Sequence, residues 1–164
     1  MAALTPGTPA PTISLKDSAG KSTTLAEQLK KGPVLAAFFK VSCPTCQFTA
    51  PFLERLHEMY GGPGFTLLGI SQDEARHTRE FMSEFGLKFP VLIDDCGYPA
   101  SNQYGLTNVP TVFLIAPDGN IQMSAVGFSK PDLEDVAVAA ARSTGKATTP
   151  LFKPGEVIPD YKPG

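Results

Sequence analysis

Apolar runs and helical periodicities alternate along most of this chain. Val34 to Phe39 is an uninterrupted apolar run of strand length, and Phe65 to Ile70 is a second one. A helical pattern lies between them, with its apolar face at Phe48, Phe52, Leu56 and Met59/Tyr60. The centre of the chain therefore reads as a buried strand, a helix and another buried strand.

Shorter patterns extend this order in both directions. They predict strands at 13–15, 21–23, 89–93, 111–116 and 121–126, and helices at 24–29, 74–85, 99–104 and from 129 onward. Strands that alternate with helices indicate an α/β fold with a parallel core, and the last two strands add an antiparallel hairpin at its edge. We expect one domain over residues 1–142. Residues 143–164 carry four prolines without periodicity and are predicted to form an irregular tail.

Two cysteines stand at the junction of the first buried strand and the helix after it. Cys43 and Cys46 have C-x-x-C spacing, with Pro44 and Thr45 between them. The unpaired N–H groups of a helix N-terminus favour a thiolate, so Cys43 is the expected attacking sulfur. Cys46 lies one turn deeper, where it would resolve a mixed disulfide formed at Cys43. The pattern predicts thiol–disulfide chemistry.

Composition and charge exclude several other classes of protein. The chain has 164 residues and a net charge of −2, and it contains no run of like charges typical of a nucleic-acid or anionic-membrane surface. No apolar run approaches the roughly 20 residues of a membrane span. No signal peptide is visible, so the expected compartment is the cytoplasm by default, or the periplasm if a leader has been removed.

Other uses of the cysteines are weaker. A zinc site needs a second Cys/His pair, and only Cys96, His57 and His77 remain. The pair could also be two small buried residues without chemistry. Cys96 is interpreted as a spare thiol, with a resolving or regulatory role as the alternative.

Taken together, these motifs resemble the thioredoxin-like superfamily, in particular the redoxin/TlpA-like thiol–disulfide oxidoreductases. The similarity runs from about residue 8 to residue 142. It rests on Cys-Pro-Thr-Cys at 43–46, Pro51, Asn108-Val109-Pro110-Thr111, Pro117-Asp118-Gly119-Asn120 and Gly127. The resemblance implies a central mixed sheet flanked by helices, with an N-terminal β-hairpin extension. It also implies a protein disulfide reductase or oxidoreductase that uses no cofactor and no metal.

The resemblance further implies a binding site for the partner protein. In that family the proline matching Pro110 is cis, and the backbone of the preceding residue, here Val109, pairs with an extended stretch of the partner. Val109, Pro110, Pro44 and Thr45 are therefore the expected substrate-binding residues. The expected partners are protein thiols and disulfides, without nucleic acid, and the chain is expected to be a monomer.

This sequence departs from the family pattern at the proton acceptor. Ala37 occupies the place of thioredoxin's buried aspartate. TlpA-like relatives often carry the acid after the next strand, where this chain has Asp73, so Asp73 is the candidate general base for Cys46. The alternative is that Asp73 is an exposed N-cap of the helix at 74.

Two other functions of the same fold stay open at this point. A peroxiredoxin would use Cys43 as its peroxidatic thiolate, but its motif sets proline seven and threonine three residues before the cysteine, where this chain has Ala36 and Lys40. A copper-binding module similar to the Sco-like relatives would use C-x-x-x-C and a distant histidine, and the spacing here is shorter.

Overall fold

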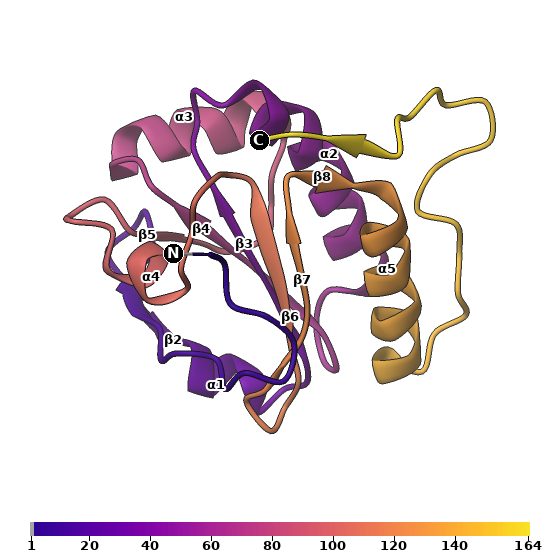
Figure 1. The fold of residues 1–164 in the computed structure, drawn as a ribbon, viewed down its shortest axis with the longest axis horizontal. Coiled ribbons are helices and arrows are strands. Elements are labelled where there is room, and N and C mark those ends of the chain that lie inside the picture. The colour runs from indigo at the N-terminus through magenta and orange to yellow at the C-terminus, as the bar shows by residue number, and fades with distance from the viewer. Residues whose placement is uncertain (1) are drawn as a thin grey trace.

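A mixed sheet of five strands forms the centre of the molecule, and helices cover both of its faces (Figure 1). The computed structural model describes residues 2–164, so Met1, where the predicted domain begins, lies outside the described residues. The strand order is β5-β4-β3-β6-β7. Strands β3, β4 and β5 are parallel, whereas β6 pairs antiparallel with both β3 and β7. The predicted parallel core with an antiparallel edge hairpin is confirmed. The elements are β1 (Ser14–Lys16), β2 (Ser22–Thr24), α1 (Leu25–Leu29), β3 (Val34–Phe39), α2 (Pro44–Tyr60), β4 (Thr66–Ser71), α3 (Ala75–Phe85), β5 (Val91–Ile93), α4 (Pro99–Gln103), β6 (Thr111–Ile115), β7 (Ile121–Val126), β8 (Phe128–Ser129), α5 (Lys130–Thr144) and β9 (Tyr161–Lys162).

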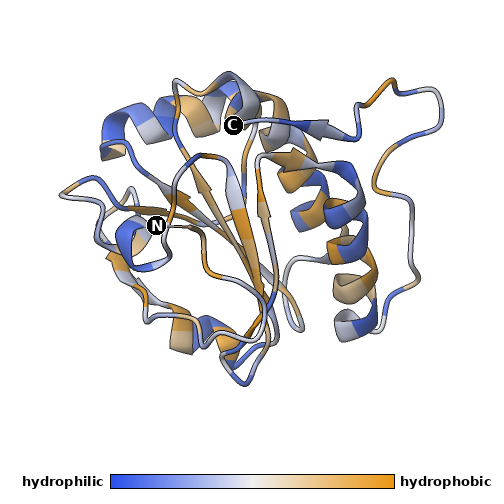
Figure 2. Cartoon of the chain, viewed as in Figure 1, coloured by the Kyte–Doolittle hydropathy of each residue, from blue (hydrophilic) through white to orange (hydrophobic). Residues whose placement is uncertain are grey.

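The central strand β3 is buried on both faces because all six of its residues are apolar. Its side chains alternate between two hydrophobic clusters. Leu35, Ala37 and Phe39 belong to the cluster that includes residues of α2, α3 and α5, and the other three belong to a cluster with α1, α4 and the N-terminal segment. Figure 2 shows these apolar strands running through the middle of the molecule, with polar positions concentrated on the outer elements. The end of β3 is thereby anchored in the core, shortly before α2 begins.

Local capping signals place the ends of two helices as the sequence predicts. The Thr24 hydroxyl accepts a hydrogen bond from the Glu27 amide at the start of α1. The Ser129 hydroxyl accepts one from the Asp132 amide at the start of α5. The N-terminal hairpin of β1 and β2 is also present, with Ser14 opposite Thr24.

The C-terminal segment differs from the expected irregular tail in two places. Helix α5 continues to Thr144, and the two-residue strand β9 pairs antiparallel with β8. Figure 1 shows this segment leaving α5, making a wide excursion and returning across the molecule toward the start of α2. A two-residue strand has no periodicity to read, because its conformation depends on hydrogen bonds to a partner strand that is distant in sequence.

Candidate active site

Cys43 is the N-cap residue of α2, in the position that the sequence predicts. Its sulfur accepts a hydrogen bond from the backbone N–H of Cys46, at 3.2 Å from nitrogen to sulfur. Pro44 occupies the first turn, where its missing N–H leaves no donor unsatisfied. The helix therefore directs an N–H dipole at the Cys43 sulfur, an arrangement that stabilises negative charge there.

The loop before β6 lies against the same sulfur. The Cys43 thiol donates to the carbonyl oxygen of Val109, with 3.4 Å between the two atoms. The Val109–Pro110 peptide bond is cis, so the predicted cis linkage is confirmed. Residues that are 66 positions apart in sequence are thus brought together at the junction of β3 and α2.

Cys46 is enclosed by the hydrophobic cluster under α2 and is only 2% exposed. Burial raises the pKa of the Cys46 thiol, and a hydrogen bond from the Cys43 side chain raises it further. The backbone of Lys40 opposes this shift through a hydrogen bond, whereas the charges of Cys43 and Asp73 add to it. All three cysteines carry free thiols, so this is the dithiol form of the site.

Asp73 is near the dithiol, but it does not cap α3. The N-cap is Glu74, whose carboxylate accepts from the His77 amide at 2.8 Å, so the N-cap interpretation of Asp73 is wrong. The Asp73 carboxylate instead accepts from the Val41 amide at 2.8 Å and is half-buried. This bond ties the acid after β4 to the segment that leads into the cysteine pair.

Thr45 is buried, and its contact comes from the far end of the chain. Its hydroxyl donates to the carbonyl oxygen of Pro163 at 2.6 Å. Gly164 lies so close to Val109 that a Cβ atom on Gly164 would overlap the Val109 carbonyl. The sequence did not predict these positions of Pro163 and Gly164, because an aperiodic Pro/Gly-rich segment carries no signal of where it docks.

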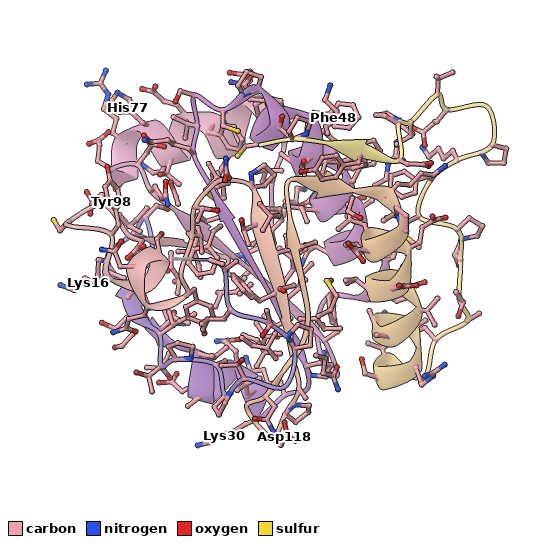
Figure 3. All side chains as sticks on the ribbon, in the orientation of Figure 1. Lys16, Lys30, Phe48, His77, Tyr98 and Asp118 are labelled. Carbon is pink, nitrogen blue, oxygen red and sulfur yellow. The ribbon has the colours of Figure 1, made fainter. Side chains whose placement is uncertain are left out.

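The remaining candidate residues lie elsewhere. Cys96 is exposed in the loop after β5. His77 is on the exposed surface of α3 (Figure 3). His57 is partly exposed and lies one turn before Gly61, where α2 ends. Over residues 2–164 there is no group of three or more His, Cys, Asp or Glu side chains that could hold a metal ion.

Comparison with known proteins adds the family. The Redoxin family model matches residues 5–141. The chain belongs to the redoxin family. This redoxin is 32% identical over 122 residues to the thiol-disulfide oxidoreductase ResA of Bacillus thuringiensis strain Al Hakam, an alignment that covers 74% of this chain and 69% of that protein.

Solved structures agree with this fold. A crystal structure described as a putative thiol:disulfide interchange protein DsbE from Chlorobium tepidum has a TM-score of 0.75 at 24% identity, covering 87% of this redoxin and 99% of that chain. The peroxidoxin BcpB from Mycobacterium tuberculosis has a TM-score of 0.72 at 24% identity, covering 85% and 97%. The peroxidoxin shares the fold, whereas the relatives above 30% identity are thiol-disulfide oxidoreductases. This redoxin is an oxidoreductase of thiols and disulfides, as the resemblance implied.

Proposed function

We propose that this redoxin exchanges the Cys43–Cys46 dithiol with disulfides of partner proteins through a mixed disulfide at Cys43. The observation that carries the proposal is the position of the Cys43 sulfur. It lies between the N-terminus of α2 and the carbonyl of Val109, next to cis-Pro110. Cys43 is partly exposed there, whereas Cys46 is buried, so Cys43 is the thiol that attacks the partner.

The exchange has two steps. The Cys43 thiolate attacks one sulfur of the partner disulfide, so that a new S–S bond forms and the other partner sulfur leaves as a thiolate. Cys46 then loses its proton and attacks the Cys43 sulfur, which releases the second partner thiolate. The dithiol is oxidised by two electrons and the partner is reduced by two, and each released thiolate takes up one proton.

Asp73 is the proposed proton acceptor for Cys46. Burial is the main cause of the raised pKa of the Cys46 thiol, and the charge of Asp73 adds to it, which supports a role for this carboxylate at that thiol. The hydrogen bond from Val41 holds the carboxylate beside the segment that carries the cysteines. A base in this position is needed because burial keeps Cys46 protonated at neutral pH.

The proposed contact surface for the partner is made of Val109, Pro110, Pro44 and Thr45. The backbone of Val109 lies beside the reactive sulfur, where an extended partner segment could pair with it. Pro44 is exposed next to Cys43, and the Thr45 hydroxyl already holds a peptide carbonyl. Backbone pairing would let the site accept many sequences.

Trapping of the mixed disulfide tests the proposal. Cys46→Ser is expected to accumulate a covalent adduct with a protein disulfide such as oxidised insulin, because the resolving thiol is gone. Cys43→Ser forms no adduct and has no reductase activity. Cys96→Ser is the matched control, because Cys96 is exposed on another loop, and it should behave as the unmodified protein. An adduct through Cys46 or Cys96 contradicts the proposal.

The two alternative functions, a peroxidase and a copper-binding module, each predict a result that disulfide exchange does not. Rapid peroxide turnover by Cys46→Ser would contradict the disulfide-exchange mechanism, because a peroxidatic Cys43 needs no second thiol for the first step. Tight stoichiometric copper binding, measured by titration and mass spectrometry, would contradict it as well. Equilibration of the dithiol with glutathione gives the direction of exchange, since related proteins range from about −270 to −120 mV.

The domain limits, oligomeric state and compartment are part of the proposal. We propose that the thioredoxin-like domain, predicted over residues 1–142, extends to Thr144 with the end of α5, that the tail follows it, and that the protein acts as a monomer. Among the described residues, no helix is both long and apolar enough to cross a bilayer. The compartment stays a prediction, cytoplasmic by default and periplasmic where a leader precedes the chain. Fusion of the natural gene product to alkaline phosphatase, which folds only where disulfides form, distinguishes the two.

A further inference from the structure

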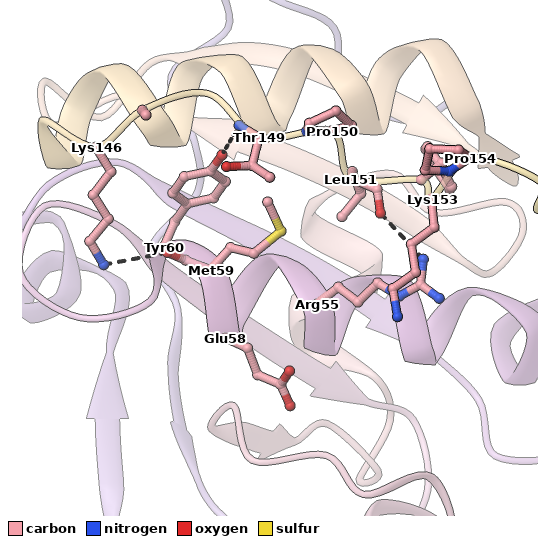
Figure 4. A pocket seen from close by; sticks show the side chains of 12 residues that line it. Arg55, Glu58, Met59, Tyr60, Lys146, Thr149, Pro150, Leu151, Lys153 and Pro154 are labelled. Carbon is pink, nitrogen blue, oxygen red and sulfur yellow. Dashed lines mark hydrogen bonds between the residues drawn. The ribbon is translucent and has the colours of Figure 1, made fainter.

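Two apolar residues, one aliphatic and one aromatic, attach the C-terminal segment to α2. Leu151 and Phe152 are buried although they stand outside every helix and strand. The Phe152 ring lies 5.0 Å from the ring of Phe52 on α2 and 6.2 Å from that of Phe128. Figure 4 shows the segment running along α2, with the Tyr60 hydroxyl accepting from the Thr149 amide at 3.1 Å. This packing sets the direction in which the rest of the segment continues.

A charged pair reinforces the attachment further along. The Arg55 guanidinium donates to both carboxylate oxygens of Glu156, at 2.8 and 2.7 Å. The same Arg55 side chain donates to the carbonyl of Leu151 at 3.3 Å. Bidentate pairs of this kind fix the relative orientation of the two groups. Arg55 therefore holds the segment at two points five residues apart.

Residues 160–164, which we call the strap, then cross the molecule as an extended chain. The Lys130 amide donates to the Asp160 carbonyl at 2.8 Å, and Phe128 and Ser129 of β8 pair with Lys162 and Tyr161 of β9. The Lys162 ammonium lies 4.9 Å from the centre of the Phe48 ring on α2, which Figure 3 places beside the final strand. Gly127, at φ +82°, has no room for a side chain because the Lys162 carbonyl would be 2.6 Å from a Cβ atom.

The strap ends on the proposed contact surface for the partner. The Pro163 carbonyl accepts from Thr45 at 2.6 Å, and Gly164 packs against the Val109 carbonyl beside cis-Pro110. An extended partner segment that pairs with Val109 would need the same space. We propose that the strap occupies the peptide-binding groove of this redoxin and must leave before a partner protein can reach Cys43. This inference rests on the proposed function, since it assumes that partners bind at Val109.

The strap also shows what kind of segment the groove fits. It holds an extended backbone whose carbonyl faces Thr45, a small residue against Val109 and a cation over Phe48. The partner segment that fits is therefore extended, with a small residue beside its cystine and a basic residue two positions away. A partner with a bulky or acidic side chain at these positions would displace the strap poorly.

The test loosens the strap by substitution within the folded protein. Lys162→Glu removes the cation over Phe48, and Gly164→Val places a side chain where the Val109 carbonyl lies. The apparent affinity for a partner is reduced by the fraction of molecules whose groove is open. The double variant should therefore lower KM for a protein disulfide about fivefold, with kcat unchanged. Val157→Glu is the control, because Val157 is 97% exposed in the same segment, and its KM should equal that of the unmodified protein.

A peptide with the sequence of residues 157–164, added to the double variant, should raise its KM again by competing for the groove. Equal KM values in the unmodified protein, the double variant and Val157→Glu would overturn the proposal that the strap occupies the groove. No competition by the peptide would overturn it as well. Either result leaves the proposed function intact. Absence of protein disulfide reduction by every protein, including the unmodified one, would instead contradict the proposed function itself.

Discussion

The Thr45 hydroxyl donates a hydrogen bond of 2.6 Å to the carbonyl of Pro163, 118 residues further along the chain. Thr45 lies between the two cysteines, so this bond joins the redox motif directly to the C-terminal strap. An internal hydrogen bond contributes about 1 kcal/mol to stability, which is enough to shift a local opening equilibrium. The bond therefore helps to hold the strap against the motif.

Removal of that hydroxyl should loosen the strap. Thr45→Val keeps the size of the side chain but loses the donor, and we expect the Lys130 amide to exchange its hydrogen about fivefold faster. That amide reports on the strap because it stands in the first turn of α5 and donates to the Asp160 carbonyl. Thr45→Ser keeps the donor and serves as the control. Unchanged exchange in Thr45→Val would show that the bond does not hold the strap.

The two active-site thiols should react very differently with an alkylating reagent. Burial raises the pKa of Cys46 well above its ordinary value, so Cys46 stays protonated and unreactive from pH 7 to 9. Mass spectrometry of the native Cys96→Ser variant should therefore show a single fast alkylation, at Cys43. Unfolding in guanidinium should expose Cys46, so that a second alkylation follows. Equally fast alkylation of both thiols in the native protein would contradict this assignment.

Asp73→Asn should have two effects of opposite sign. Loss of the carboxylate removes one cause of the raised pKa of Cys46, so alkylation of Cys46 moves to lower pH. Loss of the proton acceptor slows turnover at pH 7, by about 100-fold for a typical general base. If Asp73 had only a structural role, its substitution would not make Cys46 easier to alkylate and at the same time slow turnover. Glu74→Gln changes the neighbouring exposed carboxylate and should leave both measurements unchanged.

The Arg55–Glu156 pair should make the stability of the folded tail depend on pH. Hydrogen bonds from Arg55 and from the Lys153 backbone lower the pKa of Glu156 to about 2. A lowered pKa stabilises the folded state above the ordinary pKa of the acid, and this contribution is lost as pH falls through about 2. Glu156→Gln should therefore melt at lower temperature than the unmodified protein at pH 6, with a difference that shrinks toward pH 2. Glu58→Gln is the control, because Glu58 is an exposed acid on α2, the helix that carries Arg55. A difference in melting temperature that does not depend on pH would contradict the pairing.

Much of the fold and the reactive pair could be predicted from the sequence, because those features are local. The apolar run 34–39 has the length of a buried strand. The hydroxyls of Thr24 and Ser129 cap the helices that follow them, and the spacing of Cys43 and Cys46 places both at the start of α2. The match of Val109-Pro110 to a known family added the loop opposite the sulfur. Each of these depends on residues within a few positions of one another, or on a motif carried by the family.

The surroundings of the pair were decided by tertiary structure. Asp73 could be a cap or a base on sequence grounds, and the start of α3 at Ala75, with Glu74 as its cap, excluded the first. The strap gave no sequence signal, because an extended Pro/Gly-rich segment has no periodicity and takes its place only from distant partners such as β8 and Thr45. The sequence by itself determined which atoms can react, and the folded chain determined what lies over them, since contacts between residues more than 100 positions apart exist only once the chain has folded.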